Sequence, residues 1–377
     1  MERLRAEQQR EGAKLRRVGT DTEQMYSRLK SLPVPYAHRL PKPVWVLAHE
    51  SQTGLAEAVV RSCDQWQENA LQNGLHPDET RQIEYKDNLN WGKFKDGFPN
   101  LFIRDVKEMA GKDVIFIASF HGVEVIFEQL SMLYMLPRYL ANSVTVVLPY
   151  FPTGTMERVD MEGQVATAKT LTTMLSNIPP AGRGPCQILI YDIHALQERF
   201  YFGNEIVPRL ESAVPLLIRE LESLHLEEVL AIAFPDEGAF KRFHRAFPDA
   251  WPRIVCGKQR KGDKRTVALK EGDPKGKRVI IVDDLVQTGG TLVEAGKELL
   301  SKGAASVSAY VTHPVFPNQS WLQFAHDENP SLVMKEFWIT DSIPHAAEIA
   351  KRPPFKLLSL APHIAQCLLG FDLKRGD

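Results

Sequence analysis

The sequence has few cysteines and lacks any spacing that would join them. Cys63, Cys186, Cys256 and Cys367 stand far apart, with no CxxC pair and no Cys/His cluster at zinc-site spacing. We therefore expect reduced thiols in a reducing compartment. No apolar run approaches the roughly 18 residues that a membrane helix needs. Residues 1–20 are highly charged and have no apolar core segment, which argues against a secretory signal.

The chain also lacks an excess of charge of either sign. It has 46 basic and 47 acidic residues, for a net charge of −1, whereas a protein whose main partner is nucleic acid is usually basic. With 44% hydrophobic and 25% charged residues, the composition is that of a globular protein. We expect no nucleic acid or membrane partner. At about 100–200 residues per domain, the length predicts two domains.

Residues 1–42 differ from the rest of the chain. The first 40 residues hold nine Lys or Arg and five Asp or Glu, and residues 2–17 are rich in helix formers. An organelle-targeting peptide would be Arg-rich but poor in acids, and Glu2, Glu7 and Glu11 argue against one. We therefore expect a charged helical extension and a cytoplasmic protein, with organelle targeting as the alternative.

From residue 43 onward, short apolar strands alternate with helices. We expect strands over 44–49, 113–120, 143–151, 186–194, 229–234, 253–257, 278–284 and 306–313, and helices over 53–72, 123–139, 160–176, 209–224 and 292–302. This alternation is typical of the α/β class, with parallel sheets buried on both faces. The strands are too many for one small sheet. We therefore expect two similar α/β domains, over residues 43–205 and 206–377.

The most informative segment is RVIIVDDLVQTGGTL (278–292). Asp283 and Asp284 stand at the carboxyl end of a strand, where ligands bind in open parallel sheets. The next helix opens on Gln287, Thr288, Gly289, Gly290 and Thr291. Glycines allow close approach of the backbone, and free amides at a helix start attract phosphate. The segment is neither a Walker loop nor a GxGxxG turn. It predicts a ribose 5-phosphate site, with a plain turn and acids near a helix end as the alternative.

Two further acidic segments follow strands. YDIHALQERFYF (191–202) places Asp192 and His194 at a strand end, where the alternative is a structural, hydrogen-bonded histidine. AIAFPDEGAFKRF (231–243) places Asp236 and Glu237 after a strand. Their position suits a metal-bridged phosphate, and the alternative is a pair of acids that cap a helix over 238–245.

A cationic segment, IVCGKQRKGDKRTV (254–267), follows the strand at 253–257. Its five cations within eight residues are Lys258, Arg260, Lys261, Lys264 and Arg265. Interleaved glycines predict a mobile loop that closes and carries charge onto a reacting polyphosphate. The alternative is a solvated basic turn.

Together these segments resemble one family. The loop over 278–292 resembles that of type I phosphoribosyltransferases and ribose-phosphate diphosphokinases. Residues 43 to about 367 resemble the diphosphokinases, and most of all their plant-type second class. The motifs are ASFHGVEVIFEQL (118–130), LPYFPTGTMERV (148–159), DIHALQERFYFG (192–203), AFPDEGAFKRFH (233–244), VTHPVFPNQSW (311–321) and RPPFKLLSLA (352–361). The resemblance implies two tandem type I phosphoribosyltransferase-like domains. It also implies transfer of the β,γ-diphosphoryl group of ATP to the anomeric hydroxyl of ribose 5-phosphate, giving 5-phosphoribosyl 1-diphosphate and AMP.

The resemblance also implies roles for single residues. Lys258 and Arg260 would be catalytic, and His194, Asp236 and the neighbouring Asp192 would belong to a Mg²⁺ site. In NWGKFKDGFPNLFI (90–103), Phe94 would stack on adenine with Asp96 as a polar partner, while Asp96-Gly97 is also a good hairpin turn. Family members are oligomers, so we expect a homo-oligomer with its ATP site near a subunit interface.

Departures from the first class and two rival functions qualify this prediction. The first class has an acidic residue at the position of Phe98 and an Arg-Gln pair near Thr155–Met156, and this chain lacks both. The resemblance to the second class implies weaker activation by phosphate and weaker inhibition by ADP than in the first class. It also implies a looser choice of nucleotide donor. One rival is a phosphoribosyltransferase, which needs only one such domain. The other is a non-catalytic regulatory homologue, in which loop or metal residues should have been lost.

Overall fold

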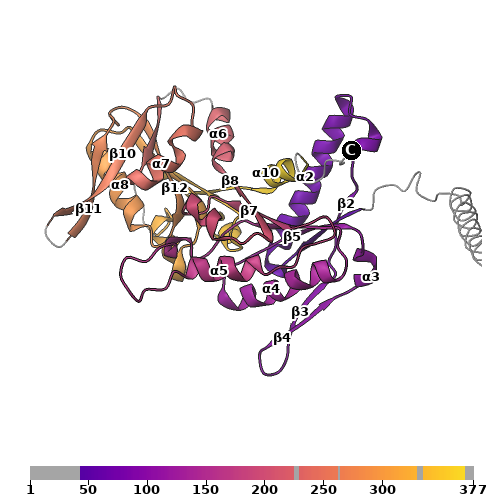
Figure 1. Cartoon of the computed structure of the whole chain (residues 1–377). Coiled ribbons are helices and arrows are strands. Elements are labelled where there is room, and N and C mark those ends of the chain that lie inside the picture. Colours follow the sequence, from indigo (N-terminus) through magenta and orange to yellow (C-terminus); the bar gives the residue numbers. More distant parts are fainter. Residues whose placement is uncertain (1–42, 225–228, 262–263, 329–333, 370–377) are drawn as a thin grey trace, which may run out of the picture. The chain divides into compact units, whose positions relative to one another are not determined.

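Two sheets flanked by helices make up most of the described chain (Figure 1). The structure is a computed structural model, and it describes residues 43–224, 229–261, 264–328 and 334–369. The helical extension expected over residues 1–42 lies outside these residues. Within the described ranges, no helix has both the length and the apolar character of a membrane span.

The first sheet has strand order β2-β1-β5-β6-β7-β8, and all of its pairings are parallel. Its strands are β1 (Val44–Ala48), β2 (Ile83–Tyr85), β5 (Asp113–Ile117), β6 (Ser143–Leu148), β7 (Cys186–Tyr191) and β8 (Ile206–Glu211). Successive side chains of a strand point to opposite faces. In β5, Val114 and Phe116 pack into one core cluster, and Ile115 and Ile117 pack into another. The apolar runs therefore form strands covered on both faces, which confirms the predicted class.

The second sheet has the order β11-β10-β9-β12-β13-β14-β15. Its strands are β9 (Leu230–Phe234), β10 (Arg253–Lys261), β11 (Lys264–Glu271), β12 (Arg278–Val286), β13 (Ser306–Pro314), β14 (Met334–Thr340) and β15 (Phe355–Leu358). All pairings are parallel except the antiparallel pair β10–β11. Because β9 and β12 are parallel neighbours, the acidic residues at their carboxyl ends meet at one edge of the sheet.

Helices connect and cover the strands. They are α2 (Thr53–Gln72), α3 (Val106–Met109), α4 (Val123–Arg138), α5 (Thr167–Ser176), α6 (Val214–Ser223), α7 (Glu237–Phe243), α8 (Gly290–Ser301), α9 (Ala346–Ile349) and α10 (Ala361–Cys367). A separate antiparallel hairpin, β3 (Leu89–Lys93) and β4 (Pro99–Ile103), extends away from the first sheet (Figure 1).

The structure differs from the predicted elements at several points in the first half, where β2, β3 and β4 are also additional strands. Strand β8 was not predicted, and the helix expected from residue 209 begins at Val214. Pro208 and the charged residues of β8 hide its strand pattern, and proline is tolerated there because β8 is an edge strand. The helix expected from residue 160 begins at Thr167, after a turn in which Gly163 has a φ of 87°.

The last described helix returns to the first sheet. α10 follows β15 of the second sheet, but it lies beside α2 (Figure 1). Ala361 and Ile364 of α10 share a core cluster with Val44 and Leu55 of the first half. The structure therefore differs from a division at residue 205 in two ways: β8 completes the first sheet, and α10 completes its core.

Candidate active site

A cleft of about 1240 Å³ lies at the carboxyl ends of β9 and β12. His194, which follows β7 of the first half, lines it together with Asp236, Asp283 and Asp284 of the second half. The predicted phosphate loop, residues 287–291, lines it as well. The cleft thus occupies the place at which open α/β sheets bind ligands.

The phosphate loop connects β12 to α8 and opens toward solvent. Gln287, Thr288, Gly290 and Thr291 are exposed, and all four line the cleft. Since α8 begins at Gly290, the amides of its first turn have no partner within the helix. Such amides, with the positive end of the helix dipole, form a binding site for phosphate.

Gly289 is the position of the loop where only glycine fits. Its φ is 82°, and a Cβ atom there would lie 2.4 Å from a ring carbon of Phe324. Behind the loop, the Ser320 hydroxyl donates a hydrogen bond of 3.1 Å to the Gln287 carbonyl. These contacts hold the loop backbone against the segment over 317–324.

His194 and Asp284 join the two halves at the cleft. His194 Nδ1 lies 2.6 Å from Asp284 Oδ2. Arg242 of α7 donates to the Ile193 carbonyl and, at 2.9 Å, to the His194 carbonyl. The second half therefore holds both the ring of His194 and the backbone that carries it.

Asp192 does not line the cleft, in contrast to its predicted place in a metal site. Its buried carboxylate accepts hydrogen bonds from the Ala213 N–H at 2.9 Å and from the Thr312 hydroxyl at 2.6 Å. Arg242 Nη2 lies 3.7 Å from its other oxygen. With these partners, Asp192 connects the two halves of the chain. Of the two residues in the segment over 191–202 that were predicted to bind metal, only His194 lines the cleft.

The paired carboxylates of β12 have opposite electrostatic environments. Burial, followed by the charge of Asp284 and a hydrogen bond with it, raises the pKa of Asp283 well above its ordinary value, and the charge of Asp236 adds to this. Burial also opposes ionisation of Asp284, but the hydrogen bond and charge of His194 and the charge of Arg242 outweigh it and lower its pKa. The cleft thus holds one ionised carboxylate and one that takes up a proton easily.

The pairing with Asp284 predicts a measurable titration of His194. The hydrogen bond to Asp284 raises the pKa of His194, and burial opposes it less strongly. We expect histidine NMR to find a titration above the ordinary range in the wild type and a lower pKa in Asp284→Asn. His49, whose pKa burial lowers to about 4 and which does not line the cleft, should keep its titration in that variant. An unchanged His194 titration in Asp284→Asn would contradict the pairing.

The acidic residues of the cleft suit a cation that is held mainly by phosphates. Asp236 caps α7 by accepting a bond of 3.0 Å from the Ala239 N–H, as the helix-capping alternative predicted, while it also lines the cleft. Among the described residues, no three ligand atoms of the cleft converge within 4.8 Å. Mg²⁺ usually takes one or two carboxylates together with waters and substrate phosphates. Asp236 and the free nitrogen of His194 are compatible with such a shared site.

The cationic segment forms paired strands and not the loop that its glycines predict. β10 runs on through Lys261 and pairs with β11, with Lys258 opposite Val267 and Arg260 opposite Arg265. Charged residues give a weak strand signal in a sequence, and here the antiparallel partner supplies the backbone hydrogen bonds. Gly257 lines the cleft, so the hairpin leaves from its edge.

The predicted adenine pair lies elsewhere. Phe94 and Asp96 stand on the turn of the β3–β4 hairpin, and neither lines the cleft. Asp96 accepts a hydrogen bond of 3.1 Å from the Phe98 N–H, and Gly97 has a φ of 90°, so the Asp96-Gly97 turn is confirmed. The Phe94 side chain is 55% exposed, which leaves it free to contact a ligand or another chain.

Comparisons with known proteins identify the family. Residues 44–178 match the family model for the N-terminal domain of ribose phosphate pyrophosphokinase, and residues 229–341 match that for the phosphoribosyl transferase domain. Ribose-phosphate pyrophosphokinase 3, chloroplastic, of Arabidopsis thaliana is 51% identical over 307 residues, 78% of this chain and 74% of the relative. Ribose-phosphate pyrophosphokinase 4 of Oryza sativa subsp. japonica is 50% identical over 81% of this chain and 94% of the relative. The chain belongs to the ribose-phosphate pyrophosphokinase family.

The fold of this pyrophosphokinase is similar to that of a solved relative. The crystal structure of phosphoribosylpyrophosphate synthetase from Mycobacterium smegmatis superposes with a TM-score of 0.69 at 22% identity, covering 87% of this chain and 98% of that one. This agreement confirms the predicted pair of phosphoribosyltransferase-like domains.

Five charged residues that line the cleft in the described part of the chain were not predicted from the sequence. They are Glu157, Arg158, Lys241, Arg242 and Lys270. The first four lie within the family-like motifs over 148–159 and 233–244, so the motifs themselves were the available signal. Lys270 had none, because only the hairpin brings β11 back beside the cleft, where Lys270 Nζ lies 2.8 Å from Glu237 Oε1.

Proposed function

We infer that this chain is a ribose-phosphate diphosphokinase that transfers the β,γ-diphosphoryl group of ATP to ribose 5-phosphate. The observation that carries this is the cleft in which the phosphate loop of the second half meets His194 of the first. A phosphoribosyltransferase site needs the loop alone. A regulatory homologue is disfavoured because the loop, both β12 carboxylates, His194 and Asp236 are all present and line one cleft.

We propose a task in this reaction for each predicted residue that lines the cleft. The 5-phosphate of ribose binds the loop amides at the start of α8, and the Asp283 and Asp284 carboxylates accept hydrogen bonds from the ribose hydroxyls. The anomeric hydroxyl is then positioned to attack the β-phosphorus in line. Asp236 and His194 would hold Mg²⁺, which neutralises polyphosphate charge when bound. Such transfer depends mostly on positioning and electrostatics.

Lys258 and Arg260 are proposed to stabilise the transferring group. They stand two residues apart on β10, and such positions share one face of a strand. The strand leaves from the cleft edge at Gly257. If the paired strands β10 and β11 move toward the cleft together, they would bring in both cations, in place of the loop that the sequence predicted.

We propose that the enzyme is a homo-oligomer in which the β3–β4 hairpin of one chain completes the ATP site of another. The hairpin exposes Phe94, Phe98 and Phe102 by 55%, 66% and 61% of their surface. Its turn does not line the cleft of its own chain. Light scattering after size-exclusion chromatography tests this, and a monomer that turns over ATP would overturn it.

Phosphorus NMR on the purified protein with ribose 5-phosphate, ATP and Mg²⁺ tests the activity. Equal amounts of AMP and a 1-diphosphate sugar establish the diphosphokinase, and a reaction without ribose 5-phosphate is the control. Undiminished turnover without inorganic phosphate supports the second-class properties. No turnover by folded protein with several nucleotides favours the regulatory homologue. Consumption of 5-phosphoribosyl 1-diphosphate with a nucleobase would instead indicate a phosphoribosyltransferase.

The names of several relatives conflict with the predicted cytoplasmic location. Relatives from Arabidopsis thaliana and Oryza sativa are named chloroplastic, and one from Spinacia oleracea is named mitochondrial. From these names we propose an organellar location for this chain. Imaging the full chain with a fluorescent protein fused to its C-terminus tests it, and diffuse cytoplasmic signal would reject it.

A further inference from the structure

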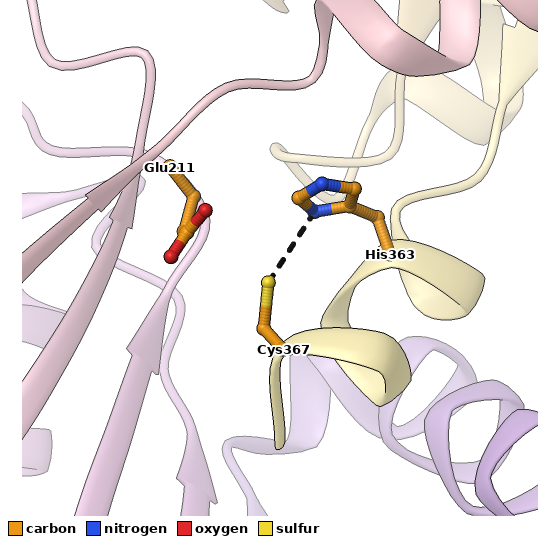
Figure 2. A group of neighbouring side chains, drawn as sticks. All are labelled: Glu211, His363 and Cys367. Carbon is orange, nitrogen blue, oxygen red and sulfur yellow. Dashed lines mark hydrogen bonds between the residues drawn. The ribbon is translucent and has the colours of Figure 1, made fainter. Parts of the chain in front are cut away.

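Three potential metal ligands converge at a place that the reaction does not use. Glu211 is the last residue of β8, and His363 and Cys367 lie four residues apart on α10. Residues at this spacing share a helix face. Figure 2 shows the imidazole and the thiol facing each other, with the Glu211 carboxylate beside them. One ligand atom of each residue lies within 4.8 Å of the other two.

The spacing of two of these atoms matches a tetrahedral zinc centre. Cys367 Sγ and His363 Nδ1 are 3.6 Å apart. Zinc bonds of about 2.3 Å to sulfur and about 2.0–2.1 Å to nitrogen, at a tetrahedral angle, place these atoms about 3.6 Å apart. The two α10 ligands are therefore already at the separation that zinc requires, and the Glu211 carboxylate lies within 4.8 Å of both.

We propose that Glu211, His363 and Cys367 bind Zn²⁺, with water as the fourth ligand, and that the ion fastens α10 to the edge of the first sheet. The ligand types decide the metal, since thiolate and imidazole select zinc, whereas Mg²⁺ prefers oxygen ligands alone. The site is distinct from the cleft, which none of the three residues lines. The sequence did not reveal it because Glu211 lies far from His363 and Cys367 along the chain.

The surroundings are compatible with a bound dication. Glu211 and a Cys367 thiolate together carry two negative charges, which balance Zn²⁺. Burial and the charge of Glu211 raise the pKa of Cys367 to about 11, so binding releases the thiol proton to solvent. Tyr191 Oη lies 2.9 Å from His363 Nδ1, and zinc would replace this contact. Arg209 Nη2, at 4.0 Å from Glu211 Oε1, competes weakly for the carboxylate.

The site would stabilise the return of α10 to the first half. α10 follows the second sheet, yet its apolar residues pack in the first core, so its attachment links the two halves. A metal bond between β8 and α10 would reinforce this link in the folded state only. Zinc is therefore expected to raise the melting temperature of the protein.

Cobalt substitution tests the site, because a cobalt–thiolate bond gives an intense near-ultraviolet charge-transfer band. We expect metal-free wild type to bind Co²⁺ with this band, to exchange it for Zn²⁺, and to melt at a higher temperature with Zn²⁺. Cys367→Ser should lose the band and weaken Zn²⁺ affinity by more than about 100-fold, since even outer-shell partners contribute about 10–100-fold. Cys63→Ala, a buried thiol outside the cluster, is the matched control and should keep the band.

The thiolate band separates this site from the cleft, because no cysteine lines the cleft among the described residues. Should Cys367→Ser fail to fold, Glu211→Gln and His363→Asn provide the same comparison through altered cobalt spectra and weaker Zn²⁺ binding. A folded wild type without the band, or a band that survives in Cys367→Ser, would overturn the proposal.

Discussion

Replacing Lys258 by alanine is expected to lower kcat by about 10³-fold or more while ATP still binds. A cation aimed at a transferring phosphoryl group contributes roughly 10³–10⁵ in rate, because it acts on charge that develops in the transition state. Lys258 is the first residue of β10 beyond Gly257, at the cleft edge. Turnover is measured by phosphorus NMR, and ATP affinity by calorimetry on the same preparations.

The matched control for this prediction is Lys264→Ala. It removes the same charge from the paired strand β11 of the same hairpin, so a general loss of positive charge would affect both variants alike. We expect Lys264→Ala to retain most of the turnover. Unchanged turnover in Lys258→Ala would reject the catalytic assignment of the hairpin, and parallel losses of ATP affinity and turnover would indicate a binding role instead.

The site was predictable from the sequence where it follows strand ends. Asp283, Asp284 and Asp236 lie at or just beyond the carboxyl ends of apolar strands, and parallel strands place these ends at one edge, so local pattern was sufficient. Lys270 was not predictable, because its place depends on how β11 folds back beside the cleft. Asp192 was wrongly placed for a related reason. Its position at a strand end did not reveal that its carboxylate accepts hydrogen bonds from Ala213 and Thr312.

The fold shows the same division between local and distant information. Fully buried strands such as β5 appear as apolar runs, and their prediction was confirmed. Edge strands were missed, because β8 and β15 are only partly buried and carry polar residues. The return of α10 to α2 rests on packing between distant segments, for which no sequence periodicity gives a signal.

The second large effect is expected for Asp283→Asn, which should reduce activity and increase stability. Losing a charged acceptor for a ribose hydroxyl removes a hydrogen bond of about 1.5–3 kcal/mol, so kcat/KM should fall by roughly 10–100-fold. At neutral pH the free energy of unfolding should rise by about 0.5–2 kcal/mol, in the range of other stabilising substitutions at functional sites. The cause is relief of burial and of repulsion from Asp284, which raise the pKa of Asp283.

The pH dependence of this gain follows from the direction of the pKa shift. Because the pKa of Asp283 is higher in the folded than in the unfolded chain, ionisation costs stability progressively above the ordinary value of 3.8. Below that pH both states are protonated, and the variant and the wild type should unfold alike. Denaturant unfolding at several pH values should therefore show a gap that opens as the pH rises.

A surface carboxylate provides the control for the stability measurement. Asp273 lies on an exposed turn, where the hydrogen bond from the Lys275 N–H lowers its pKa. Asp273→Asn removes the same formal charge but no repulsive contact, so it should not stabilise the protein at neutral pH. If Asp283→Asn were no more stable than the wild type there, the two β12 carboxylates would not repel each other in the free enzyme. Increased stability together with reduced activity would instead show that this pair is retained for ribose binding, although it lowers the stability of the fold.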